Sequence, residues 1–222
     1  VKNLIPLTFE DLNQAYGFVL YRTIIAGGQS GTLKLDGLRD YAVVLINGKK
    51  AGTLDRRLNQ DSLRITLPKE KATLGILVEN LGRVNFGKYL LQNKKGITGG
   101  VTFSGKEVNG WQMYRLPFNK IDHIKFTNNS SAGSEVPVIK KGSFDLKTVT
   151  DTYLDMRKWG KGVVWVNGHN LGRYWSVGPQ QTVYLPAEWL KQGQNEVVVF
   201  ELIKTDQTTL KSIATPILNE LE

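Results

Sequence analysis

The stretch TLKLDGLRDYAVVLINGKKAG, residues 32–52, recurs in altered form as TYLDMRKWGKGVVWVNGHNLG, residues 152–172. At a constant offset of 120 residues, a Val-Val pair, an Asn-Gly pair and a later glycine coincide without a gap. Further along, LGILVEN parallels EVVVFEL, which sets Glu79 opposite Glu201. Self-similarity at a fixed spacing predicts that the chain arose by internal duplication of one structural unit.

The repeated unit has the pattern of β-structure. YAVVLING and GVVWVNG are runs of β-branched and aromatic residues that end in Asn-Gly, the strongest short signal for a hairpin. QTVYLP, residues 181–186, alternates apolar and polar residues, as a strand with one buried face does. Further strands are expected at residues 17–24, 63–67, 101–104, 111–116 and 121–126.

Many short strands separated by turn residues predict an all-β protein of two jelly-roll, antiparallel β-sandwiches. We assign residues 1–100 to the first sandwich, with residues 1–13 as a lead-in segment that packs elsewhere, and residues 101–222 to the second. LLQNKKGITGG, residues 90–100, is the expected crossing between them.

Composition excludes several classes of function. The net charge is +9, but the basic residues are scattered as single residues and doublets, so we predict no nucleic-acid partner. No apolar run approaches the ~20 residues of a membrane span, so no span is predicted. The chain begins with Val1 and not Met, and we expect it to be a processed product or a piece of a larger protein.

Residues for catalysis and metal binding are scarce. Cysteine is absent and the two histidines, His123 and His169, lie far apart, so we predict no metal site and no cofactor. Phosphate-binding and nucleophile-elbow motifs are missing, and no pair of carboxylic acids stands out as the pair that glycoside cleavage requires. We therefore predict no catalytic residue in this chain.

The segment WVNGHNLGRYWSVGPQQTVYLP, residues 165–186, is rich in side chains that bind sugars. Aromatic rings stack on sugar C–H faces, and amides and arginine bind hydroxyl groups. Trp165 lies in an apolar strand and is expected in the core, and turn geometry accounts for Asn-Gly. Arg173, Tyr174 and Trp175 remain as sugar-binding candidates.

The chain resembles the C-terminal region of β-galactosidases of glycoside hydrolase family 35. The resemblance is carried by KGVVWVNGHNLGRYWSVGPQQTVYLPAEWLKQGQNEVVVFEL and by TFEDLNQAYGFVLYRT, LRDYAVVLINGKKAGTLDR, VENLGRVNFG and KKGITGGV, in that order. It implies that both sandwiches are of the galactose-binding-domain type. It also implies that the catalytic glutamates lie in an N-terminal TIM barrel of the same polypeptide, which these residues do not include.

The resemblance implies a parent enzyme that removes terminal β-galactose, and a chain that is inactive by itself. It further implies export to the periplasm, the cell exterior or a lysosome-like compartment, where glycans are met. Three functions are open: a structural and interface module at the rim of the substrate pocket, an autonomous galactoside-binding module using Trp175, Tyr174 and Trp111, and a stand-alone enzyme. The first is favoured.

One loop differs between the two repeats. ENLGRVNFGKY, residues 79–89, clusters Arg83, Asn85, Phe86 and Tyr89, whereas LIKTDQTTL follows the equivalent strand of the second repeat. A loop elaborated in one copy is a candidate for a special task. We expect these four residues either to face the catalytic barrel and the rim of its pocket or to form a packed connection between the sandwiches.

Overall fold

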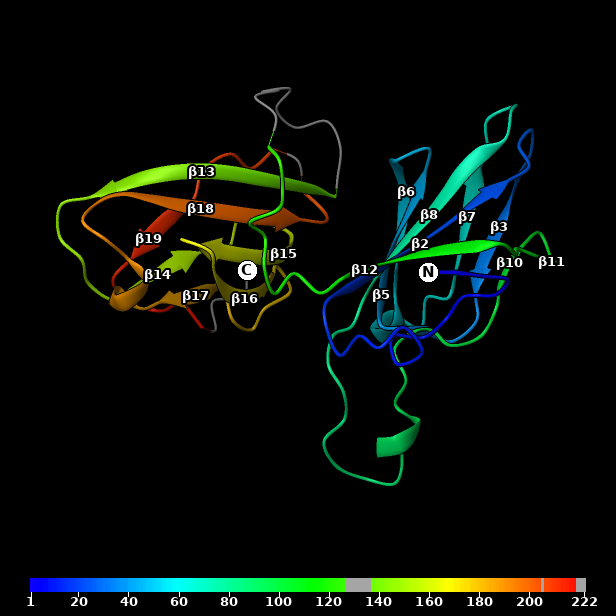
Figure 1. Cartoon of the computed structure of the whole chain (residues 1–222), viewed down its shortest axis with the longest axis horizontal. Coiled ribbons are helices and arrows are strands. Elements are labelled where there is room, and N and C mark those ends of the chain that lie inside the picture. Colours follow the sequence, from blue (N-terminus) through cyan, green and yellow to red (C-terminus); the bar gives the residue numbers. More distant parts are fainter. Residues whose placement is uncertain (127–136, 205, 219–222) are drawn as a thin grey trace. The chain divides into compact units, whose positions relative to one another are not determined.

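The computed structural model describes residues 1–126, 137–204 and 206–218, and it confirms the all-β prediction (Figure 1). The chain divides into two compact units, Val1–Phe118 and Asn119–Glu222. Every strand pair between described residues is antiparallel. The helical segments in this part of the chain are short 3-10 turns, η1 (Arg56–Leu58), η2 (Leu90–Gln92) and η3 (Ala187–Trp189).

The first unit is a sandwich of a six-stranded and a four-stranded sheet, with a two-stranded ribbon beside them. The six-stranded sheet has the order β1 (Lys2–Asn3), β12 (Trp111–Leu116), β2 (Phe18–Ile25), β8 (Ala72–Glu79), β5 (Tyr41–Ile46) and β6 (Lys49–Asp55). The four-stranded sheet has the order β11 (Lys106–Glu107), β10 (Val101–Phe103), β3 (Ser30–Leu35) and β7 (Ser62–Thr66). The ribbon pairs β4 (Leu38–Arg39) with β9 (Gly96–Ile97).

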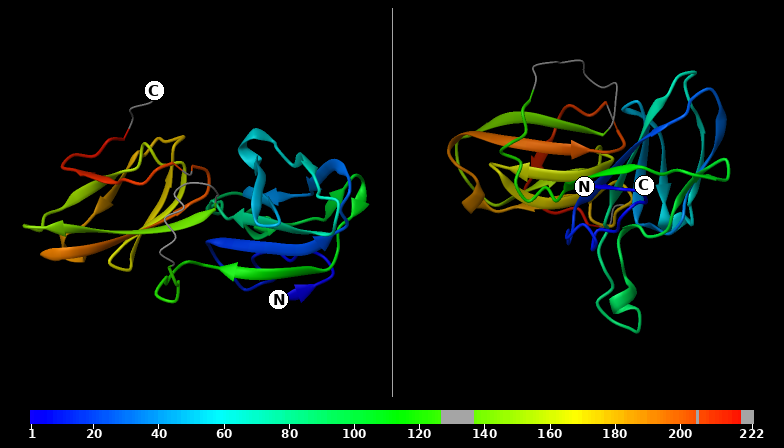
Figure 2. Two further views of the ribbon diagram at one scale, coloured as in Figure 1. Left: turned by 90° about the horizontal axis from the view of Figure 1, so that it is seen from above. Right: turned by 45° about the vertical axis from the view of Figure 1, so that its right-hand side comes forward.

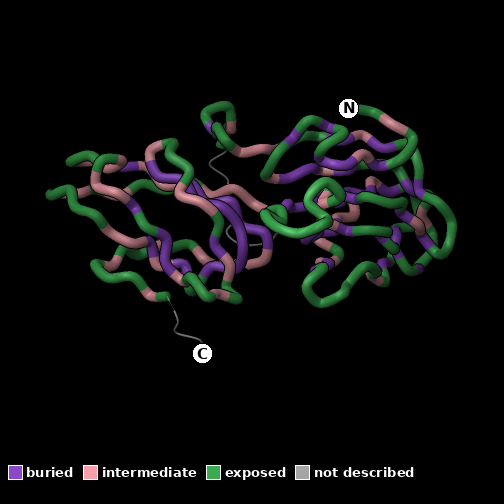
Figure 3. Tube along the Cα trace, turned by 90° about the horizontal axis from the view of Figure 1, so that it is seen from below, coloured by how far each residue is buried: buried purple, intermediate pink, exposed green. Residues whose placement is uncertain are grey.

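The second unit is a smaller sandwich. Its four-stranded sheet has the order β13 (Val138–Leu146), β18 (Gly193–Glu201), β15 (Lys161–Val166) and β16 (His169–Trp175). Its three-stranded sheet has the order β17 (Thr182–Leu185), β14 (Thr152–Asp155) and β19 (Lys211–Ile213). In both units most of the buried residues lie on strands, and most residues of the connecting loops are exposed (Figure 3).

The duplication is visible in the hairpins β5–β6 and β15–β16. Asn47 and Gly48 have φ of 51° and 82°, and Asn167 and Gly168 have φ of 48° and 82°. Two successive residues with positive φ make the two-residue turn that Asn-Gly predicts. In both hairpins the register shifts three residues before the turn, between Val44 and Leu45 and at the equivalent place in β15. The repeat therefore preserves the turn and the bulge together.

The predicted division after residue 100 differs from the observed one after Phe118. Strand β10 pairs with β3, and β12 pairs with β2, so residues 101–116 complete the first sandwich. The segment 90–100, expected to cross between the sandwiches, also belongs to the first unit because β9 pairs with β4. Strand pairing over a long sequence separation decides the boundary here, and local composition does not reveal it.

Two smaller expectations also differ from the structure. Residues 1–13 do not pack elsewhere: β1 pairs with β12, and Phe9 and Leu12 are buried in the core of the first unit. The strand expected at residues 121–126 is absent, because Ile124 donates its N–H to the carbonyl of Ile121 and closes a turn there.

Gly162 in β15 is required by a close backbone approach. A Cβ atom at this position would lie 1.7 Å from the carbonyl oxygen of Phe200 and 2.8 Å from the hydroxyl of Tyr174. Strand β15 is buried along its whole length, so its neighbours have no room to move away.

We expect Gly162→Ala to destabilise the second unit by roughly 2–3 kcal/mol, because the added methyl group overpacks a filled interior. Urea unfolding followed by tryptophan fluorescence measures this, since four of the five tryptophans lie in that unit. Gly142→Ala is the matched control, because its Cβ would meet only Val197 Cγ1 at 3.6 Å. Equal effects of the two substitutions would contradict the close-approach explanation.

Candidate functional site

The first unit carries a long arm, residues 80–95, between strands β8 and β9. In two views it extends away from the strands of its own sandwich (Figures 1 and 2). Large apolar side chains on the arm are exposed: Phe86 at 89%, Leu91 at 98% and Tyr89 at 59%. Asn85 is also exposed. Exposed apolar side chains that gather in one place mark interaction sites, and the arm carries three of them on one loop.

The stem of the arm is anchored by Asp40, a buried carboxylate at the end of the sandwich. Asp40 accepts a hydrogen bond from Lys95 Nζ at 2.6 Å and one from the backbone N–H of Leu81 at 2.9 Å. The side chains of Lys95 and Asp40 are 3% and 7% exposed. Because Leu81 lies next to the first residue of the arm and Lys95 is its last, one carboxylate holds both ends of the arm.

Glu10 and Arg83 form a second anchor. Glu10 pairs with the Arg83 guanidinium and accepts the backbone N–H of Lys95 at 3.0 Å, and Arg83 also donates to the carbonyl of Ala15. Partial burial alone would raise the pKa of the Glu10 carboxyl, but the hydrogen bonds from Arg83 and Lys95 outweigh it and lower the pKa. Arg83 therefore fixes the stem, while Phe86 and Tyr89 remain on the exposed tip.

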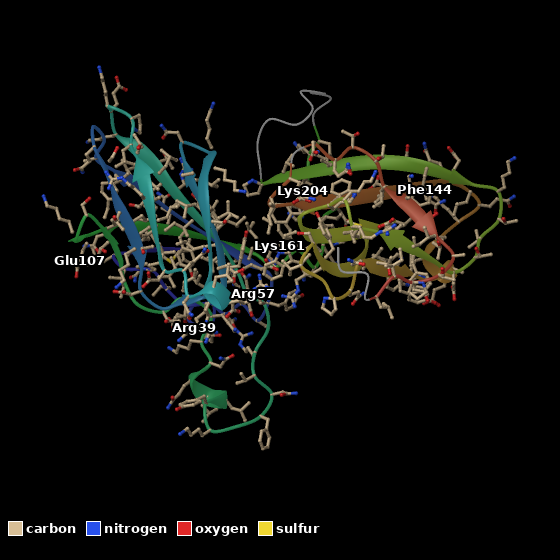
Figure 4. All side chains as sticks on the ribbon, turned by 180° about the vertical axis from the view of Figure 1, so that it is seen from behind. Arg39, Arg57, Glu107, Phe144, Lys161 and Lys204 are labelled. Atoms are coloured by element: carbon tan, nitrogen blue, oxygen red, sulfur yellow. The ribbon has the colours of Figure 1, made fainter. Side chains whose placement is uncertain are left out.

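A cleft of about 970 Å³ lies beside the stem, and we call it the basic cleft. Arg39 and Arg57 mark it at the end of the first unit from which the arm extends (Figure 4). Its other charged lining residues include Arg56, Arg83 and Lys95. Asp40 pairs with Arg56 at 3.1 Å, and Asp55 pairs with Arg57 at 2.6 Å. The cleft is therefore less positive than its arginine content suggests.

The carboxylates that line the basic cleft are not arranged for glycoside cleavage. Asp40 is held by Lys95, Arg56 and the N–H of Leu81, so its oxygen atoms are occupied by structural partners. Asp61, the other lining carboxylate, lies 3.8 Å from Lys34 at the surface. The cleft can bind hydroxyl or carboxylate groups through its arginines, but it offers no acid and nucleophile pair.

The sugar-binding candidates of the second unit lie on strand β16, and the strand divides them between two faces. Tyr174 is buried and donates its hydroxyl toward the carbonyl of Phe200 and the carboxylate of Glu201, both at 3.0 Å. Burial, with Glu201 beside it, raises the pKa of the Tyr174 hydroxyl. Tyr174 thus belongs to the core and is not on a sugar-binding surface.

Arg173 and Trp175 lie on the opposite face of the same strand. Arg173 is exposed, and Trp175 is half-buried with Lys161 Nζ 3.8 Å from the centre of its ring. His169 stacks on Trp189 at 4.7 Å. Trp111, the third ring of the alternative sugar platform, is buried in the core of the first unit. The structure therefore places Arg173 and Trp175 on one face of β16. Tyr174 and Trp111, the other predicted sugar-binding residues, are buried and do not lie on that face.

Glu201 is a structural anchor, and its position in the repeat differs from the predicted one. Its carboxylate accepts the backbone N–H groups of Gly160, Lys161, Ile203 and Lys204 at 2.8–3.1 Å. Val44 pairs with Ile76 and Val164 pairs with Val199, so the register aligns Glu201 with Val78 and not with Glu79. The expected equivalence of the two glutamates was wrong by one residue.

Sequence reasoning missed the residues that hold the arm. Asp40, Glu10 and Lys95 come from three separate segments, and none lies in a recognisable motif. Leu91, the most exposed apolar side chain of the arm, lies in the segment expected to cross between the sandwiches. The sequence signal for an exposed apolar tip is YLLQ, residues 89–92, an apolar group between polar residues that is followed by Lys94-Lys95.

Within the residues described, no group of three or more His, Asp or Glu side chains is placed to hold a metal ion. The short helical turns of that same part of the chain have neither the length nor the apolarity of a membrane-spanning helix.

Comparison with known proteins gives two family matches. A family model described as "Beta-galactosidase, first all-beta domain" matches residues 6–117, and one described as "Beta-galactosidase, galactose-binding domain" matches residues 137–195. The first match ends within the first unit, one residue before its last residue, Phe118.

Curated relatives agree with these matches. The chain is 41% identical over 181 residues to a β-galactosidase of Xanthomonas manihotis, and the alignment covers 81% of the chain and 30% of that protein. It is 36% identical over 231 residues to β-galactosidase 17 of Arabidopsis thaliana (89% and 33% covered). With the β-galactosidase of Homo sapiens it shares 35% over 227 residues (91% and 33% covered). The chain therefore spans about a third of the length of the curated relatives it matches.

We expect Asp40→Asn to destabilise the first unit by about 3–5 kcal/mol, because it leaves the buried Lys95 ammonium without its counter-charge. Urea unfolding followed by the NMR amide signals of β2 and β8 measures the change. Asp61→Asn is the matched control: its pair with Lys34 is exposed and contributes at most about 1 kcal/mol. A small effect of Asp40→Asn, within the range of the control, would show that the stem does not depend on this pair.

Proposed function

Because this chain belongs to the β-galactosidase family, we propose that it is the structural and interface part of a β-galactosidase that removes terminal β-galactose. In this proposal, a TIM barrel outside these residues carries the catalytic glutamates. The chain docks against that barrel and contributes to the rim of its substrate pocket. The lengths of the relatives, about three times that of this chain, support a further domain in the same polypeptide.

The arm is the observation that carries the interface role. Its stem is fixed by a buried ion pair and a second, partly buried one, while Phe86 and Leu91 are almost fully exposed. An interface gains affinity when its contact residues are held in place before binding, because less conformational freedom is lost. Phe86, Tyr89 and Leu91 are the exposed apolar residues of the arm, and the barrel is their proposed partner.

The basic cleft supports the rim role. Arg83, Val84 and Asn93 belong to the stem and also line the cleft. A partner surface that contacts the arm would therefore lie beside the guanidinium groups of Arg56 and Arg57, which line the same cleft. Guanidinium and amide groups bind sugar hydroxyls, so this side of the cleft suits the outer, acceptor part of a galactoside.

A galactoside-binding module is the second candidate, and the match of residues 137–195 to a domain described as galactose-binding favours it. Arg173 and Trp175 provide one exposed guanidinium and one half-buried ring on a single face. This pair is smaller than the predicted set, since Tyr174 lies in the core. We rank this function below the interface role for that reason.

We expect Phe86→Ala to weaken association of residues 1–222 with the separately produced catalytic part by about 30-fold, as removal of a central aromatic residue does. Isothermal titration calorimetry measures the affinity, and transglycosylation in the complete enzyme measures acceptor preference, which should also change. Ile24→Ala is the control, because Ile24 is 59% exposed on β2 and remote from the arm. Unchanged affinity and unchanged acceptor preference would reject the interface role.

Titration of the isotope-labelled chain with galactose and lactose tests the second candidate. Saturable amide shifts around residues 173–175 that disappear in Trp175→Ala would establish a sugar site on β16. We expect no such shifts. A flat titration up to tens of millimolar excludes any affinity better than roughly −2.5 kcal/mol.

A further inference from the structure

The two units differ at one edge of their larger sheet. In the first unit β2 lies between β12 and β8, whereas in the second unit β13 ends its sheet and pairs, among the described strands, with β18. Strand β13 is nine residues long, and all its residues are half-buried or exposed. A long uncovered edge is a template for another strand, and proteins normally cover or interrupt it.

The strand register shows that β2 and β13 are equivalent. Along the first sheet, Val44 of β5, its partner on β8 and Tyr21 of β2 form one row. Along the second sheet, Val164 of β15, its partner on β18 and Lys140 of β13 form the equivalent row. A strand added beside β13 would therefore occupy the position in the second unit that β12 occupies beside β2 in the first.

Strand β12 completes the first core. Met113 pairs with Tyr21, and the ring of Trp111 lies 6.5 Å from that of Tyr21 in an edge-to-face arrangement. Both Trp111 and Met113 are buried between the two sheets. An antiparallel strand at this edge thus contributes two large apolar side chains to the sandwich interior.

The second unit has a cavity where those two side chains would lie. Its volume is about 440 Å³, and its lining includes the consecutive residues 140–144 of β13, with Trp159 and Leu210 from other segments (Phe144 is labelled in Figure 4). The buried indole N–H of Trp159 has no hydrogen-bond acceptor among the described residues. Such a group usually has a partner in the complete protein.

Two described segments contact side chains of β13: Lys140 Nζ donates to the carbonyl of Gln207 at 2.7 Å, and Lys141 Nζ lies 5.3 Å from the ring centre of Phe126. The described residues that follow β19 lead away from this edge. The backbone N–H of Ile217 bonds to the Thr182 hydroxyl at 3.1 Å, and its carbonyl accepts the N–H of Gln181 at 3.3 Å. This path leads to β17, at the end of the three-stranded sheet opposite β19. In the first unit, by contrast, the chain continues from β10 through β11 into β12, beside β2.

We propose that an extended segment of the same polypeptide, outside residues 1–222, pairs antiparallel with β13 and inserts two bulky apolar side chains into this cavity. Backbone hydrogen bonds give such strand addition its affinity, and pockets for alternate side chains give its specificity. The inference rests on the proposed place of the chain within a longer polypeptide, but it does not depend on the arm.

Amide hydrogen exchange tests the proposal in the complete polypeptide and in residues 1–222 alone. We expect alternate amides of residues 138–146 to exchange at least ten-fold more slowly in the complete polypeptide, because a partner strand protects them. Amides of β18, paired on both sides in either case, are the internal reference. Equal exchange of β13 in the two proteins would overturn the proposal, even in a fully active enzyme.

Gly142→Leu tests the insertion of side chains. Its Cβ has space, and the longer side chain enters the cavity and competes with the incoming residues. We expect it to abolish the extra protection of β13 in the complete polypeptide without lowering the melting temperature of residues 1–222. Retained protection would overturn the proposed insertion. Protection that appears in residues 1–222 alone and rises with concentration would assign the edge to a second copy instead.

Discussion

Each unit depends on the register of one hairpin, and a two-residue turn with positive φ at both residues sets that register. Because side chains alternate along a strand, a slip of one residue would exchange the two faces of the sheet. Val164 and Val166, which pack between the two sheets, would exchange faces with Trp165, which is buried on the other face of the strand. The same register directs Tyr174 to Glu201 on one face and Trp175 to the buried Lys161 on the other. The turn thus decides which aromatic residues are available to a ligand.

Local signals explain what could be predicted from the sequence. Asn-Gly, apolar alternation and the internal repeat all act over a few residues, and they gave the hairpins, the all-β class and the two sandwiches. The domain boundary could not be read in this way, because β12 finds its partner β2 only in the folded chain. Tyr174 and Trp175 are equally aromatic in the sequence, and only the register after the bulge separates them.

Duplication has left two copies that share a hairpin and differ at their edges. The first copy closes its sheet with β12 and extends the loop after β8 into an arm. The second copy keeps the loop short, uses Glu201 to gather four backbone N–H groups, and leaves β13 at the end of its sheet. A shared hairpin allows these changes, since loops and edge strands can vary while the register of the core is preserved.

The arm shows why a charged stem and an apolar tip belong together. An apolar tip on a mobile loop would lose conformational freedom on every encounter with a partner, and that loss would subtract from its affinity. Asp40 and Glu10 fix both legs of the loop before any partner arrives. Burying the Lys95–Asp40 pair gives little stability in itself. If either side chain moved away, however, the other charge would be left buried and unpaired. The pair is therefore better understood as a link that fixes the two ends of the arm than as a source of folding energy.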